Sequence, residues 1–262
     1  MIQSIYRSIT IAGIAVLASQ QAYAQQGYFK DDFSWGFNSG IWQARSGSNG
    51  TPFGCTFEPS MITPSSHGIT LNVTPGQCAE LRTQQMLSYG NIQGSLKTGN
   101  TPGTVSSIFT YTSWYDVPGR AWQEIDIEFL PSLGNVVHTN VIYQPQGGHY
   151  ESWEQDIDLG QYGLNITQDL VTIGFDWSSW KIEWYVYDAW GNRQVIRTLY
   201  KDNGDGYLAH NEIPQYAWPN DPTRLMINHW HGDNSASAMY FPKQYHWGNA
   251  WAYYDYLEYA PH

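Results

Sequence analysis

Residues 122–130 read WQEIDIEFL, a stretch in which acidic and apolar side chains alternate. Successive side chains of an extended strand point to opposite faces, so the three acidic residues, Glu124, Asp126 and Glu128, share one face. The two isoleucines and Phe129 share the other face, which can anchor the strand in a hydrophobic core. The alternation therefore predicts a half-buried strand with a row of carboxylates on its wet side.

Such a row is unfavourable for stability because like charges on one strand face repel each other. A functional role explains it better than a structural one. Two roles fit the residue types. Retaining glycosidases use two carboxyl groups about 5–5.5 Å apart, and calcium is held by carboxylate oxygens. Glu124 and Glu128 lie about 13 Å apart along an ideal strand, so curvature and leaning side chains must close that gap in a glycosidase. An acidic edge strand without function is the third reading.

The rest of the chain is divided by Gly, Pro, Asn and Ser into short alternating or aromatic runs. Sustained apolar spacing of the helical kind is absent, so the pattern predicts one all-β domain, a sandwich or barrel. Besides the acidic strand, the predicted strands are 69–73, 94–97, 105–111, 136–143, 171–177, 182–187, 224–230 and 252–259.

The polar stretch from Asp188 to Pro222 is predicted to be a long surface loop with a tight turn. Its residues 201–212 resemble a calcium loop, but Lys201 stands at the first position, where a carboxylate is needed. We therefore expect no ion there.

The composition limits the class of ligand. The 262 residues include 13% charged and 16% aromatic residues, with a formal net charge of -11. An acidic chain with few basic residues is unsuited to nucleic acid or to anionic membrane surfaces. A surface poor in charge and rich in rings suits neutral polar ligands with apolar faces, above all sugars. Trp114, Tyr115 and Trp122 lie close to the acidic residues, although each ring taken singly is more typical of a core than of a ligand contact.

The N-terminus predicts export. Arg7 is followed by the apolar run 9–18 and by Ala22-Tyr23-Ala24, a small-x-small cleavage pattern. Residues 1–24 are therefore predicted to be a signal peptide and residues 25–262 one secreted domain, extracellular or periplasmic, with no membrane segment. In that compartment the only two cysteines, Cys55 and Cys78, are expected to form a disulfide, two free thiols being the alternative.

Several motifs together resemble glycoside hydrolase family 16, and within it the bacterial β-1,3-1,4-glucanases (licheninases). The strand Glu-Ile-Asp-Ile-Glu-Phe at 124–129 carries no extra residue, as in the licheninases and the plant xyloglucan transglycosylases and unlike typical laminarinases. The other matching segments, in the family's order, are 49–50, 53–57, 78–83, 105–112, 147–149, 174–177, 184–186 and 226–230.

The resemblance implies a jelly-roll (concanavalin A-like) sandwich of two curved antiparallel sheets, with a β-glucan substrate in a cleft across one of them. It implies that Glu124 is the nucleophile, Asp126 its assistant and Glu128 the acid/base, in a monomer that needs no cofactor for catalysis. The implied substrate-binding residues are Asn49, Glu80, Arg82, Phe109, Tyr111, Trp122, Asn140, Asn228 and Trp230. The cysteine pair matches the licheninase disulfide, and a structural calcium is implied at Asp32, Gly68 and Asp255.

Some positions depart from the licheninase pattern. Gln123 stands where Asp is usual, Pro131 replaces Gly, and His231 replaces Asn. Ile142 replaces Tyr, a role that Tyr143 takes over if the register slips. Mixed-linkage β-1,3-1,4-glucan is the expected substrate. The alternatives are a xyloglucan-type or other β-glucan transglycosylase, a non-catalytic carbohydrate-binding sandwich, and an exported structural protein of the wall.

Overall fold

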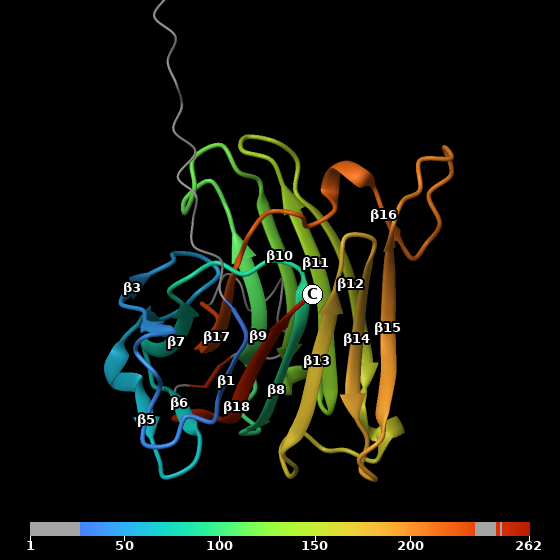
Figure 1. Cartoon of the computed structure of the whole chain (residues 1–262). Coiled ribbons are helices and arrows are strands. Elements are labelled where there is room, and N and C mark those ends of the chain that lie inside the picture. The colour runs from blue at the N-terminus through green and yellow to red at the C-terminus, as the bar shows by residue number, and fades with distance from the viewer. Residues whose placement is uncertain (1–26, 234–244, 247) are drawn as a thin grey trace, which may run out of the picture.

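The computed structural model describes residues 27–233, 245–246 and 248–262. Within these residues, two nine-stranded sheets pack face to face into a sandwich, which agrees with the predicted all-β class (Figure 1). No helix in the described part of the chain is long and apolar enough to cross a membrane. The predicted signal peptide, residues 1–24, lies outside the described residues.

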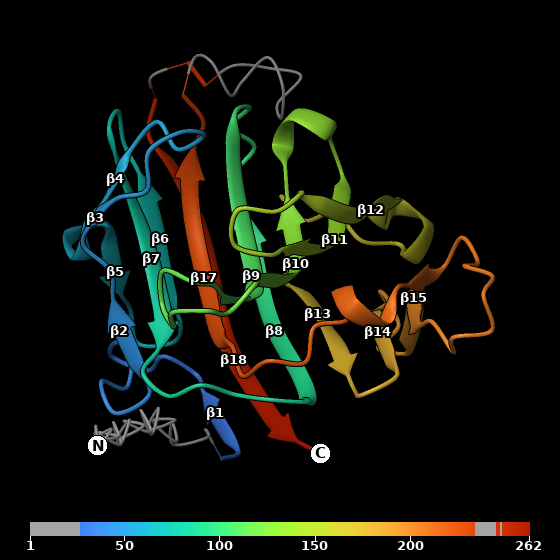
Figure 2. The same cartoon turned by 90° about the horizontal axis from the view of Figure 1, so that it is seen from above.

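One sheet carries the acidic strand and is called the acidic sheet. Its order is β12-β11-β10-β9-β17-β7-β4-β3, with β2 beside β7. Its strands are β2 (Trp42–Ala44), β3 (Gly47–Ser48), β4 (Thr56–Phe57), β7 (Gln77–Thr83), β9 (Thr104–Thr112), β10 (Trp122–Phe129), β11 (Val136–Gln144), β12 (Glu151–Asp158) and β17 (Arg224–His231). Figure 2 shows β10, the acidic strand, between β9 and β11.

The second sheet, called the opposing sheet, has the order β16-β15-β14-β13-β8-β18-β6-β5, with β1 beside β18. Its strands are β1 (Phe29–Asp31), β5 (Ile62–Pro64), β6 (Ile69–Val73), β8 (Gly90–Thr98), β13 (Val171–Trp177), β14 (Lys181–Tyr187), β15 (Arg193–Lys201), β16 (Glu212–Ile213) and β18 (Ala250–Pro261). The short 3-10 turns are η1 (Pro59–Met61), η2 (Pro131–Leu133), η3 (Leu159–Tyr162) and η4 (Gln215–Ala217).

The core between the sheets fixes which face of β10 meets solvent. Ile125, Ile127 and Phe129 are fully buried in it, as the alternation predicted. The carboxylates of the same strand must therefore point away from the core, onto the outer face of the acidic sheet. Burying an aliphatic or aromatic side chain stabilises the fold by about 1.5–3 kcal/mol, so turning the strand over would be strongly unfavourable.

Polar side chains of the opposing sheet also cross the core to bind the acidic sheet. Trp184 donates its indole N–H to the carbonyl of Asp126 at 3.0 Å. The hydroxyl of Tyr254 lies 3.0 Å from the carbonyls of both Ser107 and Asn228, so its proton is shared between neighbouring strands. Because both donors are fully buried, these bonds tie the backbone around the acidic row to the other sheet.

The prediction of a long loop over 188–222 is wrong in its first third. Residues 193–201 form β15, which pairs with β14 along its length, and the truly irregular part begins after it. Five of its nine residues are charged or polar, namely Arg193, Gln194, Arg197, Thr198 and Lys201, and this polar composition hid the strand. Of the longer strands, β7 and β12 were also not among those predicted; β12 lies at the sheet edge and carries mostly polar, exposed residues.

The turn at 202–206 is held by its own polar side chains. The side chains of Asp202, Asn203 and Asp205 each accept a hydrogen bond from the backbone N–H two residues later. These are Asx turns, in which the side-chain oxygens serve the backbone itself.

The disulfide between Cys55 and Cys78 is present, as expected, with the two Cα atoms 5.8 Å apart. It joins the chain just before β4 to β7, with which β4 pairs in parallel. Around it lies a small second hydrophobic cluster that includes Phe57 and Trp230. The bridge therefore fastens the two short strands at this end of the acidic sheet, β3 and β4, to β7.

Replacing both cysteines, Cys55→Ser/Cys78→Ser, is expected to lower the free energy of unfolding by about 3 kcal/mol, because the unfolded chain regains the freedom of this loop. In a domain of this size that corresponds to a fall in Tm of about 6–12 °C. Calorimetry of the variant checks this, with reduced and alkylated wild-type protein as the matched control. An unchanged Tm would show that the bridge constrains nothing.

Candidate active site

The strand register arranges the predicted site residues in rows across the acidic sheet. Directly opposed residues on neighbouring strands share a face. Each carboxylate therefore belongs to a separate row of side chains that runs across the strands. The row of Glu128 contains Glu80, Asn228, Ser107 and His138. The row of Asp126 contains Arg82, Met226, Phe109 and Asn140, and the row of Glu124 contains Arg224, Tyr111 and Ile142. Seven of the nine predicted sugar contacts thus lie in, or next along β10 to, these three rows.

Hydrogen bonds link the row of Glu128 into one network. Arg45 donates to the carboxylate of Glu80 at 3.1 Å and also to the side chain of Asn49. Asn228 donates to the other oxygen of Glu80 at 3.3 Å and accepts from the hydroxyl of Ser107. Asn49, although exposed on a loop, is thereby connected to the sheet.

The two ends of the acidic row differ in their hydrogen bonding. Trp122 donates its indole N–H to Glu124 at 2.6 Å, and the side chains of Asp126 and Glu124 are hydrogen bonded to each other. No hydrogen bond to the Glu128 side chain occurs within the described residues. Donors stabilise a carboxylate, so these bonds oppose the rise that burial causes in the pKa of Glu124, whereas Glu128 is open to an incoming group.

All three carboxyl groups have raised pKa values. Burial raises the pKa of Glu124 to about 8, the charges of Glu128 and Glu80 add to the rise, and the bonds from Trp122 and Asp126 oppose it. Burial raises the pKa of Asp126 well above its usual range, and the charges of both neighbours add to this.

Burial also raises the pKa of Glu128, against the lowering effect of His138. Asp126 therefore keeps a proton under conditions in which a free aspartate has lost it, and this proton is the one it donates to Glu124. With Glu124 ionised and Glu128 protonated, the row has the combination that acid-assisted displacement at a sugar carbon uses.

Aromatic side chains surround the Glu124 end of the row. The ring of Trp122 lies 6.3 Å from that of Tyr111 and 5.7 Å from that of Tyr150, measured between centroids. Tyr150 is exposed, so this wall faces solvent. Rings in this setting can stack on the apolar face of a pyranose.

At the other end of the sheet, Trp230 is only 7% exposed and packs against Phe53 at 4.3 Å between ring centroids. It lies on the face of the acidic row but forms part of the cluster around the disulfide.

Two departures from the licheninase pattern involve β10 and β11. Gln123 is buried on the core side, where its carbonyl accepts the N–H groups of Asn220 and Asp221 and its amide donates to the Asp221 carboxylate at 3.2 Å. An aspartate there would have no proton to offer that carboxylate.

Tyr143 does not take over from Ile142. Tyr143 is paired with Gln123 and lies on the core side, while Ile142 is paired with Glu124.

The other two departures have local explanations. Pro131 opens the turn η2, a position at which proline's fixed φ and missing N–H are tolerated. His231 stacks on Tyr245 with ring centroids 4.2 Å apart and accepts a hydrogen bond from the backbone N–H of Gly76.

Three residues of the site were missed from the sequence. Arg45, Ser107 and His138 lie in or beside the row of Glu128, and His138 is held at 2.7 Å by Asp156. The alternation of β9 and β11 places Ser107 and His138 on the same face as the predicted Phe109 and Asn140, and this signal was available. Arg45 had no comparable signal, since it stands in a segment without a regular pattern.

The predicted calcium positions come together at the edge of the opposing sheet. Gly68 donates to the carbonyl of Asp32 at 3.0 Å, and Tyr253 contacts both His67 and Asp255. Carbonyl and carboxylate oxygens are the donors that calcium takes, so the residues fit the ion. Within the described residues no three His, Cys, Asp or Glu side chains form a metal cluster, so backbone oxygens would have to contribute. Calcium binding stays a prediction.

Comparison with known proteins assigns the family. The model of a family described as glycosyl hydrolases family 16 matches residues 49–248. The chain belongs to glycosyl hydrolases family 16. It is 34% identical to a β-glucanase of Bacillus subtilis (strain 168) over 225 residues, which cover 83% of this chain and 80% of that protein.

Two solved structures of family 16 type are also similar. The β-glucanase of Bacillus licheniformis superposes with a TM-score of 0.73 at 28% identity, covering 91% of this chain and all of that one. A prokaryotic β-1,3-1,4-glucanase (lichenase) derived from a mouse hindgut metagenome gives a TM-score of 0.71 at 26% identity, over 90% of this chain and all of that one. The jelly-roll prediction and the resemblance to bacterial β-glucanases are confirmed.

Replacing Glu124 with Gln is expected to lower kcat/KM on β-glucan by about 10³-fold or more, as the loss of a nucleophile does. Replacing Glu128 with Gln should lower it by about 10²–10⁴-fold, the contribution of a general acid. Glu154→Gln, on the same face of the edge strand β12, two strands away from β10, is the matched control and should stay near wild type.

A glycoside with a dinitrophenolate leaving group separates the two roles, since such a group departs without a proton. It should restore the first step in Glu128→Gln but not in Glu124→Gln. Retention of more than a tenth of wild-type activity by either variant on the polysaccharide would contradict the assignment.

The raised pKa of Glu124 also predicts a stability effect. A free glutamate ionises near pH 4.3, whereas this one does so at about 8 in the folded protein. Between these values the folded state binds the additional proton, so the free energy of unfolding falls as pH rises. Glu124→Gln should therefore have a higher Tm than wild type at pH 8 and a smaller advantage at pH 5.

Calorimetry at pH 5, 6.5 and 8 measures this difference, with Glu58→Gln, outside the acidic row, as control. A Tm advantage that is equal at all three pH values would mean that the folded and unfolded proteins bind the Glu124 proton alike.

Proposed function

We propose that the protein is a secreted, retaining endo-β-glucanase whose main substrate is mixed-linkage β-1,3-1,4-glucan. The observation that carries the proposal is the acidic row, with a doubly hydrogen-bonded Glu124 at one end and an open Glu128 at the other. The names of the relatives support the substrate class, since they are β-glucanases and include a lichenase. The signal-like N-terminus and the disulfide support secretion.

In the first half of the reaction, a carboxylate oxygen of Glu124 attacks the anomeric carbon of the sugar. Glu128 gives its proton to the glycosidic oxygen as the bond from that oxygen to the anomeric carbon breaks. The leaving chain departs with a new hydroxyl group, and the remaining sugar is esterified to Glu124. Trp122 and Asp126 stabilise the negative charge of Glu124 before the attack, and Glu128 ends as a carboxylate.

In the second half, Glu128 takes a proton from water while the water oxygen attacks the anomeric carbon from the face that the leaving chain vacated. Glu124 leaves as a carboxylate and Glu128 has regained its proton, so the site returns to its starting state. Two inversions give net retention of configuration. The network of Arg45, Glu80 and Asn228 supplies charged and amide groups that can bind sugar hydroxyls beside Glu128.

Two alternatives use the same surface differently. A transglycosylase would use a sugar hydroxyl in place of water in the second half, with the same two glutamates. A binding module would need the rings and amides but not the row of three carboxylates, whose mutual repulsion contributes nothing to sugar binding.

We also propose that the enzyme works as a monomer, needs no cofactor for the reaction, and carries calcium only as a structural ion at the position described above.

Early product is expected to keep the β configuration at its new reducing end. Proton NMR during the first minutes of barley glucan hydrolysis records the anomer before mutarotation mixes the two forms. A predominantly α product would exclude the retaining mechanism.

Product sizing on lichenan, laminarin and xyloglucan tests the substrate in the same assay. Fastest cleavage of barley glucan and lichenan is expected. Products longer than the starting oligosaccharides would instead identify a transglycosylase.

A further inference from the structure

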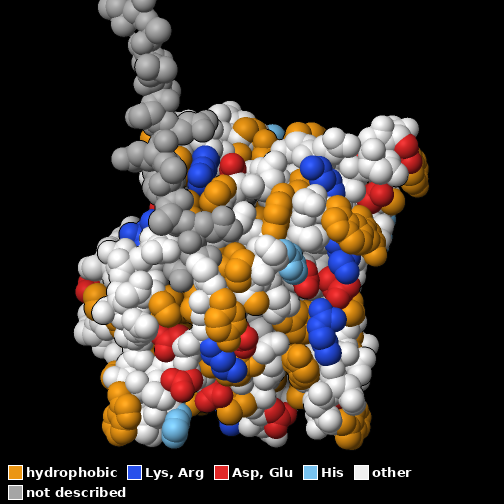
Figure 3. Space-filling model, in the orientation of Figure 1, with side chains coloured by type: hydrophobic (Ala, Val, Ile, Leu, Met, Phe, Trp, Pro, Cys, Tyr) orange, Lys and Arg blue, Asp and Glu red, His pale blue; other side chains and the backbone are white. Residues whose placement is uncertain are grey.

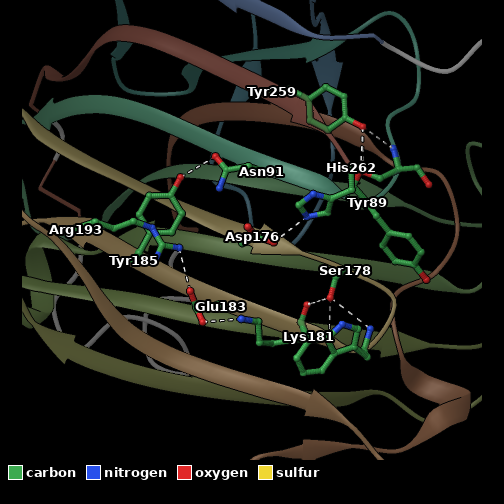
Figure 4. Close-up of polar contacts among 12 residues, drawn as sticks. Tyr89, Asn91, Asp176, Ser178, Lys181, Glu183, Tyr185, Arg193, Tyr259 and His262 are labelled. Carbon is green, nitrogen blue, oxygen red and sulfur yellow. Dashed lines mark hydrogen bonds and ion pairs between the residues drawn. The ribbon is translucent and has the colours of Figure 1, made fainter.

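The outer face of the opposing sheet, which points away from the acidic row, has two parts. In the first part, the polar side chains form hydrogen bonds and ion pairs with one another (Figure 4). Arg193 covers the ring of Tyr185 at 3.9 Å and binds Glu183 at 3.0 Å, while the Tyr185 hydroxyl donates to Asn91 at 2.8 Å. These contacts cover the sheet, and that part is closed to a ligand.

The second part of the same face is an open groove of about 1060 Å³. The outward side chains of β18, Trp251 and Tyr253, form one side of it, and the segments 163–170 and 188–191 form the other. Its volume is at the upper end of the range of about 300–1,000 Å³ found for ligand sites. Trp251 is 39% exposed and Leu170 is 49% exposed, so apolar surface remains open to a ligand.

The charged groups that line this groove are already engaged. The ammonium group of Lys97 donates to the carbonyl of Gln168 at 2.6 Å. Asp169 accepts the N–H of Asn165 at 2.8 Å, and Asp188 accepts several donors from its own turn and from β15. A charged ligand would have to compete with these bonds. What is left for a ligand is ring surface together with hydroxyl groups, such as that of Thr70.

From this groove we infer a second carbohydrate-binding site, which takes a stretch of neutral polysaccharide chain. A pyranose has an apolar face that stacks on an exposed ring and a rim of hydroxyls that bond to threonine and tyrosine hydroxyls. Hydrophobic and uncharged side chains make up most of this face of the molecule (Figure 3). That the chain is a β-glucan rests on the proposed function, whereas the preference for a neutral glycan follows from the groove itself.

The groove and the acidic row lie on opposite outer faces of the sandwich, so a chain in one does not displace a chain in the other. A polysaccharide held in the groove keeps further stretches of polymer near the acidic row. The second binding event then takes place at a raised effective concentration. The site should therefore matter for insoluble polymer and be irrelevant for short oligosaccharides.

The test uses the inactive full-length variant Glu124→Gln and insoluble mixed-linkage glucan in a sedimentation assay. A saturating soluble tetrasaccharide of the same glucan is added to fill the acidic face. Trp251→Ala in this background removes the ring from the groove, and Leu170→Glu adds a charge without disturbing buried packing. Trp180→Ala, an exposed tryptophan of the same sheet outside the groove, is the matched control.

With the tetrasaccharide present, the parent variant is expected to stay bound to the insoluble glucan. Trp251→Ala and Leu170→Glu should each weaken that binding about tenfold, as loss of a stacking ring does, while Trp180→Ala should not. In the active enzyme, the same two changes should slow hydrolysis of insoluble glucan and leave kcat on the tetrasaccharide unchanged.

Three results would overturn the inference. One is complete release of the parent variant by the tetrasaccharide, which would mean that only the acidic face binds glucan. Another is equal weakening by Trp180→Ala, which would show non-specific adsorption. The third is unaltered binding in Leu170→Glu, which decides the question even where Trp251→Ala fails to fold. Hydrolysis of soluble β-glucan by the wild type is measured separately, so the proposed function stands or fails on its own.

Discussion

The repulsion among three carboxyl groups on one strand face is the constraint around which this protein is built. The strand can be kept in place only if its other face is held firmly, and three fully buried apolar side chains do this. Burial raises the pKa values of all three groups, and repulsion adds to the rise at Glu124 and Asp126, so the row keeps protons that free carboxyls would lose. The energetic penalty and the chemical usefulness of the row therefore have the same origin.

Much of this arrangement could be predicted from the sequence because β-strand alternation is a local rule. Once β10 is recognised, the faces of Glu124 and Ile125 follow, and the same rule places Phe109 and Asn140 on their strands. The rule also decides between Ile142 and Tyr143: two residues on from Asn140 is Ile142, so the slipped register was never compatible with the rest of the prediction. The acidic strand needed no knowledge of the remaining chain.

What could not be predicted depends on contacts between distant segments. Arg45, Glu80 and Asn228 come from three parts of the chain, and only the register between strands shows that they form one network. The strand β15 was missed for another reason. Its outward residues are polar and its partner strand is needed to satisfy its backbone, so its composition resembles that of a loop. The groove behind the opposing sheet likewise arises from two loops that meet only in the folded protein.

The buried hydrogen bonds from Trp184 and Tyr254 have a consequence for how a substrate must behave. They join the backbone beneath the acidic row to the other sheet, so neither sheet can slide over the other without leaving buried carbonyls unpaired. A platform of this kind is stiff compared with a sugar ring, whose chair, boat and skew forms differ by only a few kcal/mol. To bring the anomeric carbon in line with Glu124, the pyranose ring must therefore change its conformation while the protein keeps its own.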